Sequence, residues 1–191
     1  MSQSIETATF ENISLKNPRC GKFETVDTPL LLVHSCKAPF GVELDSIYAP
    51  LPKFAGGSDP RKFLMVQLEV NEEAADGFRR LDAACLTQSK HIGEWSSLVV
   101  TRDGRQFIKA RINIEGERLT TFRVDGSELL TGWEFFCSAL ATCNNLKGAE
   151  LKAAISVQYI WSVSGKRGLT LGIDQLVVTR AEPRAHIDHF A

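Results

Sequence analysis

The sequence lacks an excess of charge of either sign, because its 22 lysines and arginines are balanced by 23 aspartates and glutamates, for a net charge of −1. This balance argues against a protein that is basic all round and binds polyanions with its whole surface, but it permits a local basic face. Positive charge is concentrated in residues 101–123, which hold 6 lysines and arginines against 3 acidic residues, whereas residues 1–80 hold 9 against 11.

Long apolar runs and targeting signals are also missing. No apolar run approaches the roughly 18 residues of a membrane span. The opening MSQSIETATF has neither the basic region nor the apolar region of a secretory signal. The five cysteines are an odd number without the spacing of a disulfide framework or a zinc site, so we expect free, mostly buried thiols. We therefore expect an intracellular protein of the cytoplasm or nucleus, not secreted and with no membrane partner.

The motifs of common enzymes are absent. There is no Gly-x-x-x-x-Gly-Lys phosphate loop, no Gly-x-Gly-x-x-Gly and no Gly-x-Ser-x-Gly elbow. The C-terminal His186, Asp188 and His189 could collect a metal, but we interpret this polar tail as disordered. Glu72 and Glu73 stand at a predicted helix start, where the helix dipole accounts for them. We expect no enzyme, no cofactor and no metal site.

The chain does contain six or more short strand patterns and one good helix. The helix is predicted in residues 71–92, with Asn71 as its N-cap and with Arg79, Arg80 and Asp82 facing solvent. The strand candidates are residues 4–17, 28–44 (bent at its prolines), 62–70, 96–102, 105–114, 118–124 and 151–180. This pattern favours a mostly β barrel or sandwich of the α+β type with long loops. We expect one domain over residues 1–191, with its core at about 23–182 and a flexible tail at 183–191.

The segment RQFIKARINI (residues 105–114) is the first candidate for a binding surface. Asp103-Gly104 predicts a hairpin that leads into it. Alternation places Ile108, Ala110, Ile112 and Ile114 on one face, and Phe107, Lys109, Arg111 and Asn113 on the other, facing water. An exposed ring beside two cations suits a protein that stacks bases and contacts phosphates of a single strand. In the alternative interpretation, Phe107 pairs with a cross-strand neighbour or lies under a loop.

The last two strands raise the same question for Tyr159 and Trp161. Strict alternation puts both rings on the face of Leu151, Ile155 and Val157, which predicts a core wall; direct base stacking is the alternative, and the polar tips could still reach a rim. A glycine turn at residues 165–168 joins the strands. The candidate nucleic-acid-binding residues are Phe107, Lys109, Arg111, Arg105, Arg123, Lys152, Lys166, Arg167, Tyr159 and Trp161.

Two stretches resemble a known family. GGSDPRKFLMVQLEV followed by the helix, and LKGAELKAAISVQYIWSVSGKRGLTLGIDQLVV, look like the single-stranded DNA-binding proteins of podovirus replication machinery and their counterparts in large algal DNA viruses. The resemblance covers about residues 55–182. The phage members end in a long acidic tail with a terminal aromatic residue that recruits partners, whereas this chain ends AEPRAHIDHFA.

The resemblance implies an OB-like five-stranded Greek-key barrel with extra strands that binds single-stranded DNA without sequence specificity. It implies a viral protein of DNA replication, recombination or repair, with replication proteins such as a polymerase or helicase as candidate partners; a homodimer is left open. The alternative is a viral structural or assembly β-sandwich that does not bind nucleic acid, which the near-neutral net charge favours.

Overall fold

The computed structural model describes residues 2–11, 13–16, 23–43, 63–114, 118–124, 127–132, 134 and 143–181. Within these ranges the α-helix α1 (Glu72–Gln88) accompanies thirteen strands and a 3-10 turn at Asn144–Leu146, and Gly132 and Glu134 are also helical. The strands are β1 (Ser2–Ser4), β2 (Ser14–Lys16), β3 (Phe23–Asp27), β4 (Leu30–Ala38), β5 (Val42–Glu43), β6 (Phe63–Val70), β7 (Glu94–Ser96), β8 (Val99–Arg102), β9 (Arg105–Asn113), β10 (Thr121–Val124), β11 (Leu130–Thr131), β12 (Ala149–Val163) and β13 (Lys166–Arg180). The expected mostly β fold with one main helix is confirmed.

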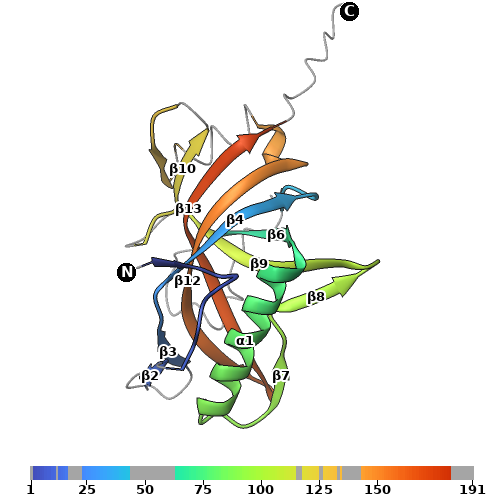
Figure 1. Ribbon diagram of the computed structural model, residues 1–191. Coiled ribbons are helices and arrows are strands. Elements are labelled where there is room, and N and C mark those ends of the chain that lie inside the picture. The colour runs from blue at the N-terminus through green and yellow to red at the C-terminus, as the bar shows by residue number, and fades with distance from the viewer. Residues whose placement is uncertain are drawn as a thin grey trace, which may run out of the picture.

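Five of these strands close into a barrel. Around the ring the order is β4, β6, β9, β13 and β12, and β12 then pairs with β4 again. All neighbours in the ring are antiparallel except β9 and β13, which run parallel. The two 15-residue strands β12 and β13 curve along the molecule, as Figure 1 shows in orange and red.

This connectivity defines an OB-like barrel. In chain order the barrel strands follow the sequence first, second, third, fifth and fourth around the ring, which is a closed Greek key rather than two packed sheets. The sandwich architecture expected under the structural-protein alternative is therefore wrong. The N-terminal segment predicted as one edge strand is instead two short strands: β1, beside β4, and β2, beside β3.

Local chemistry accounts for α1. The Asn71 side chain accepts a hydrogen bond from the Ala74 backbone N–H at 2.8 Å, which confirms the predicted N-cap. Phe78 and Leu81 are fully buried in the core. Gly77 lies within the helix because the N-terminal segment crosses it closely: a Cβ at this position would lie 2.2 Å from the backbone oxygen of Ile5.

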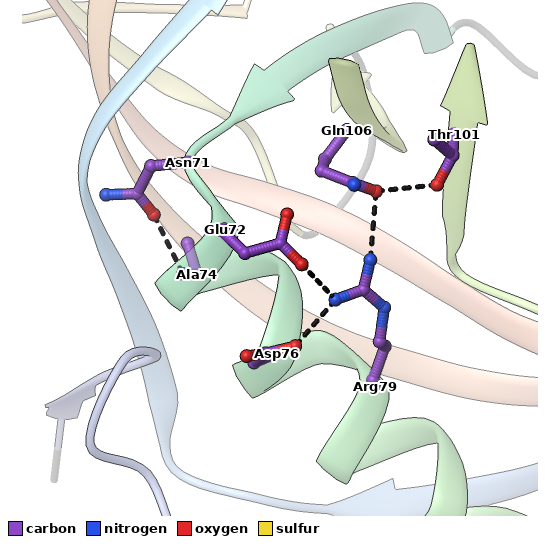
Figure 2. Close-up of polar contacts among 7 residues, drawn as sticks. All are labelled: Asn71, Glu72, Ala74, Asp76, Arg79, Thr101 and Gln106. Carbon is purple, nitrogen blue, oxygen red and sulfur yellow. Dashed lines mark hydrogen bonds and ion pairs between the residues drawn. The ribbon is translucent and has the colours of Figure 1, made fainter. Parts of the chain in front are cut away.

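Arg79 ties the helix to the β8–β9 hairpin (Figure 2). Its guanidinium donates to Glu72 at 2.8 Å and to Asp76 at 2.6 Å within the helix, and to the Gln106 side chain at 2.9 Å. The Gln106 amide oxygen also accepts from Thr101, on the neighbouring strand. Gln106 therefore lies on the helix side of β9, so Phe107, next along the strand, lies on the opposite side.

The prediction that Asp82 faces solvent is wrong, because only 7% of the residue is exposed. Its carboxylate accepts hydrogen bonds from Trp95 Nε1 at 3.1 Å, Ser97 Oγ at 3.1 Å and the Leu98 N–H at 2.7 Å. The segment after the helix, residues 95–98, thus folds back over Asp82, which helix periodicity alone had predicted to be exposed to solvent. Burial raises the pKa of Asp82, and the three hydrogen bonds only partly oppose this effect.

Several sequence expectations are met. Asp103 and Gly104 both have positive φ in the turn between β8 and β9, as the hairpin prediction requires. Cys36, Cys85 and Cys143 are buried free thiols, and burial raises the pKa of Cys36 and of Cys85 to about 12. Cys20, Cys137, the predicted loop at residues 48–61 and the tail at 183–191 lie outside the described residues.

The raised pKa of Asp82 predicts a pH dependence of stability. Because the folded protein holds this proton more tightly than the unfolded chain, the contribution of Asp82 to the free energy of unfolding is greatest below the ordinary pKa of 3.8. It falls as the pH rises through the raised value. Urea unfolding of the wild type and of Asp82→Asn between about pH 3.5 and 7 isolates the effect. The stability of the wild type relative to the variant should decrease over this range; a constant difference would contradict the assignment.

Candidate nucleic-acid interface

A β-bulge decides which side chains of β12 face outward. Between Val157 and Tyr159 the register of β12 against β13 shifts, so that Val157 lies opposite Leu171 but Tyr159 lies opposite Thr170. The extra residue reverses the alternation, because it makes every later side chain change faces. Ile160 is fully buried, whereas Tyr159 and Trp161 are partly exposed on the outside of the barrel. The prediction that these two rings form a core wall with Val157 is wrong.

Arg111 contacts one of these two rings, Tyr159, and also the ring of Phe63. We call Phe23, Phe63, Arg111, Tyr159 and Trp161 the outer aromatic face. Arg111 donates to the Tyr159 hydroxyl at 2.7 Å, and its guanidinium carbon lies 4.3 Å from the Phe63 ring centroid and 5.6 Å from that of Tyr159. Both distances are those of cation–π contacts, which position the cation without neutralising it.

Two further contacts complete the outer aromatic face. The Phe23 and Tyr159 rings meet edge to face with their centroids 4.9 Å apart, and Phe23 lies opposite Trp161 in the pairing of β3 with β12. Trp161 lies over Gly168 of β13, where an added Cβ would be 2.9 Å from Trp161 Cζ2. The missing side chain at Gly168 is therefore what admits the indole.

Lys109 and Arg111 lie side by side on the outward side of β9, separated by one buried alanine. Neither forms an ion pair with a carboxylate in the described part of the chain. Other cations are neutralised: Arg105 pairs with Glu69, and Lys37 with Glu150. The hydrogen bond from Arg105 is the main reason why the pKa of Glu69 is lowered. The electrostatic field of Lys109 and Arg111 is thus available to an anion.

The expectation that Phe107 is exposed is wrong, because 4% of the residue is accessible. The ring does lie on the predicted outward side of β9, but Phe40 covers it, with ring centroids 5.9 Å apart and planes tilted by 34°. The Arg105 guanidinium lies over the same ring, 5.3 Å from its centroid. The alternative that Phe107 lies beneath a neighbouring segment is the one the structure supports.

The two cations expected in the last turn have different surroundings. The turn itself is Ser164–Gly165, and Lys166 and Arg167 are the first residues of β13. Lys166 is exposed and lies opposite Glu94 of β7. Arg167 is partly buried: it donates to the backbone oxygens of His91 and Gly93 and lies over the Trp95 ring. Arg167 therefore holds residues 91–93 against the hairpin.

Lys152 and Arg123 flank the other end of β13. Both lie beside Val177, Lys152 on β12 and Arg123 on β10, and both are exposed. Lys152 also lines an open groove of about 190 Å³ with His34 and Gln175. Of the ten predicted residues, the structure brings Arg111, Tyr159 and Trp161 into one cluster and places Lys109 beside it.

Sequence reasoning missed Phe23, Phe63 and Phe40. Alternation along β6 could have found Phe63, because it shares a face with Met65 and Gln67. The signal for the bulge was Ile160, an aliphatic residue that strict alternation places among Lys152, Ser156 and Gln158. No local pattern marks Phe23 or Phe40.

The fold and this surface define an OB-like barrel whose second and third strands, β6 and β9, carry Phe63, Lys109 and Arg111 on their outer side; neither cation has a carboxylate partner among the described residues. No protein-family model and no characterised protein sequence matches the chain. Similar solved structures are single-stranded DNA-binding proteins of bacteriophages. That of phage Enc34 in complex with single-stranded DNA has 12% identity and a TM-score of 0.52, covering 91% of this chain and 99% of that chain.

A second structure of the Enc34 protein has 10% identity and a TM-score of 0.50, covering 93% of this chain and 96% of that chain. That of phage T7 has 12% identity and a TM-score of 0.49, covering 84% of this chain and 97% of the other. At such identities the Enc34 similarities show a shared fold. A shared fold does not by itself imply a shared ligand. In the described part of this chain no helix could span a membrane, and no group of three or more potential ligands could hold a metal ion.

The contact between Trp161 and Gly168 predicts the effect of a side chain at that position. Gly168→Val would push into the indole and approach the backbone oxygen of Ser96, which would lie 3.1 Å from the new Cβ. We expect the free energy of unfolding to fall by about 1–3 kcal/mol in urea denaturation. Gln175→Val, on a partly exposed position of the same strand, should change it much less; equal effects would contradict the proposed packing.

Proposed function

We propose that the protein binds single-stranded DNA without sequence specificity, through the outer aromatic face and Lys109. The observation that carries this proposal is Arg111, which contacts the Phe63 and Tyr159 rings and has no carboxylate partner in the described part of the chain. The Phe23 ring packs on Tyr159, and Trp161 lies opposite Phe23 in the strand pairing. Aromatic rings accept any base by stacking, and the cations contact the phosphates. Arg111 lies on the third strand of the barrel, and the second and third strands form the surface with which OB folds bind oligonucleotides or oligosaccharides.

Charge favours a nucleic acid over an oligosaccharide at this surface. A neutral sugar chain gains little from Lys109 and Arg111, whereas a phosphate backbone gains from each unpaired cation that displaces a counterion. Aromatic rings make up most of the outer aromatic face, and a ring can stack on any base. This composition supports stacking rather than base-specific recognition.

The similar fold of a phage protein determined with single-stranded DNA supports the proposal. We further propose that this chain acts in viral DNA replication, recombination or repair inside the host cell, with a polymerase or helicase as partner. The family resemblance of the sequence, including the counterparts in large algal DNA viruses, motivates this more specific role.

The test is a titration of labelled oligo-dT and of duplex DNA. The wild type should prefer the single strand. Arg111→Ala should weaken oligo-dT binding about ten-fold or more, which corresponds to about 1.4 kcal/mol of binding free energy. The substitution removes a cation and also the contacts that position the Phe63 and Tyr159 rings. The matched control is Arg79→Ala, which removes the same charge from a guanidinium held by Glu72 and Asp76 on the helix. Absence of oligo-dT binding by the wild type at low salt, or equal losses in the two variants, would refute the proposal.

Lys109 predicts a change in salt dependence. If its exposed ammonium contacts one phosphate, Lys109→Ala should reduce the slope of log affinity against log salt by about 0.7. Lys37→Ala is the control, because Lys37 is already paired with Glu150 at 3.8 Å and should leave the slope unchanged. Fluorescence anisotropy at several salt concentrations measures the slopes of both variants. An unaltered slope for Lys109→Ala would show that the bound DNA does not contact Lys109.

A further inference from the structure

The Phe40 ring is exposed to solvent, although it packs against another ring, that of Phe107. It follows β4 in the turn at residues 39–40, and 54% of the residue is exposed. Its ring rests on that of Phe107, which is nearly buried, so Phe107 supports a ring whose other side is open. Exposing a large apolar side chain forgoes about 1.5–3 kcal/mol that burial would contribute.

The surroundings of Phe40 form a small apolar surface. Val100 of β8, which lies opposite Phe107 in the strand pairing, is 41% exposed. Arg105 covers part of the Phe107 ring and is held there by Glu69. We call Phe40, Val100, Arg105 and Phe107 the Phe40 patch. These four residues are far fewer than the roughly 20–30 residues a side of a stable protein interface, but one ring is enough for one base.

The Phe40 patch lies on the same side of β9 as the outer aromatic face. Phe107, Lys109 and Arg111 project to the same side of β9, and Gln67 lies opposite Lys109 on β6. From Phe107 to Arg111 the chain spans about 13 Å at the rise of a strand. At about 3.4 Å per nucleotide of a helical strand this is about four nucleotides, and an extended strand needs fewer. Lys109 lies between the two groups of rings, where it could meet the phosphates that join them.

We propose that Phe40 is a second base-stacking position on the DNA path, separate from the outer aromatic face and connected to it by Lys109. This inference rests on the proposed function and extends it, because it makes the binding site bipartite and gives it a minimum length. A strand too short to span β9 contacts the outer aromatic face alone. A longer strand places a further base on Phe40, with Phe107 as the support beneath.

The experiment compares oligo-dT of increasing length, from about 2 nucleotides, which is too short to span from Phe107 to Arg111, to about 16 nucleotides. Phe40→Ala should bind the shortest oligonucleotides as the wild type does and lose about ten-fold or more in affinity for the longer ones. Phe40→Tyr keeps a ring and should restore the affinity for long strands. The control is Leu86→Ala, which removes an exposed aliphatic side chain of α1 and should follow the wild type at every length. Thermal unfolding confirms that all variants are folded.

The outcomes separate this inference from the proposed function. If the wild type binds oligo-dT and Arg111→Ala weakens it, but Phe40→Ala equals the wild type at every length, the second stacking position is refuted while the proposed function stands. If Phe40→Ala instead changes the oligomeric state in sedimentation without changing DNA binding, the patch is a protein contact and the inference is also refuted. If the wild type does not bind oligo-dT, the proposed function itself fails.

Discussion

The extra residue that β12 carries opposite β13 at Val157–Tyr159 is the constraint on which the candidate interface depends. Without it, Tyr159 and Trp161 would continue the inward face of Val157, and Ile160 would point to solvent. With it, one aliphatic side chain enters the core and two aromatic rings leave it. The same two strands close the barrel, so the bulge cannot shift without disturbing the ring of five strands.

The arginines of the protein have two different kinds of partner, and the barrel fold decides which kind each one meets. Arg79, Arg105 and Arg167 use their donors on the protein itself: on two helix carboxylates, on Glu69, and on the backbone oxygens of residues 91–93. Arg111 is held instead by rings and a phenol, which orient it, and no carboxylate among the described residues compensates its charge. Position in the sequence does not distinguish these arginines; the partners that the fold brings to each of them do.

Small residues in β13 make room for this arrangement. Gly168 admits the indole of Trp161, and Gly172 admits the side chain of Gln158, whose amide nitrogen lies 2.2 Å from where a Cβ would be. Gly172 is paired with Arg111 of β9, so this close packing of side chains on bare backbone adjoins the outer aromatic face.

Local patterns in the sequence were enough to define the elements whose chemistry is local: the N-cap of α1 at Asn71, the hairpin at Asp103-Gly104 and the buried face of Ile108, Ala110 and Ile112. These depend on neighbours within a few residues, so periodicity and turn chemistry reveal them. The other features follow from contacts between distant segments. Phe107 is covered by a ring from a turn far away in the chain, Asp82 is buried by the segment after its helix, and the bulge exists only relative to β13. Alternation shows which residues of a strand lie on the same face. The pairing with the partner strand decides where that alternation reverses, and the packing of distant segments decides which face is exposed to water.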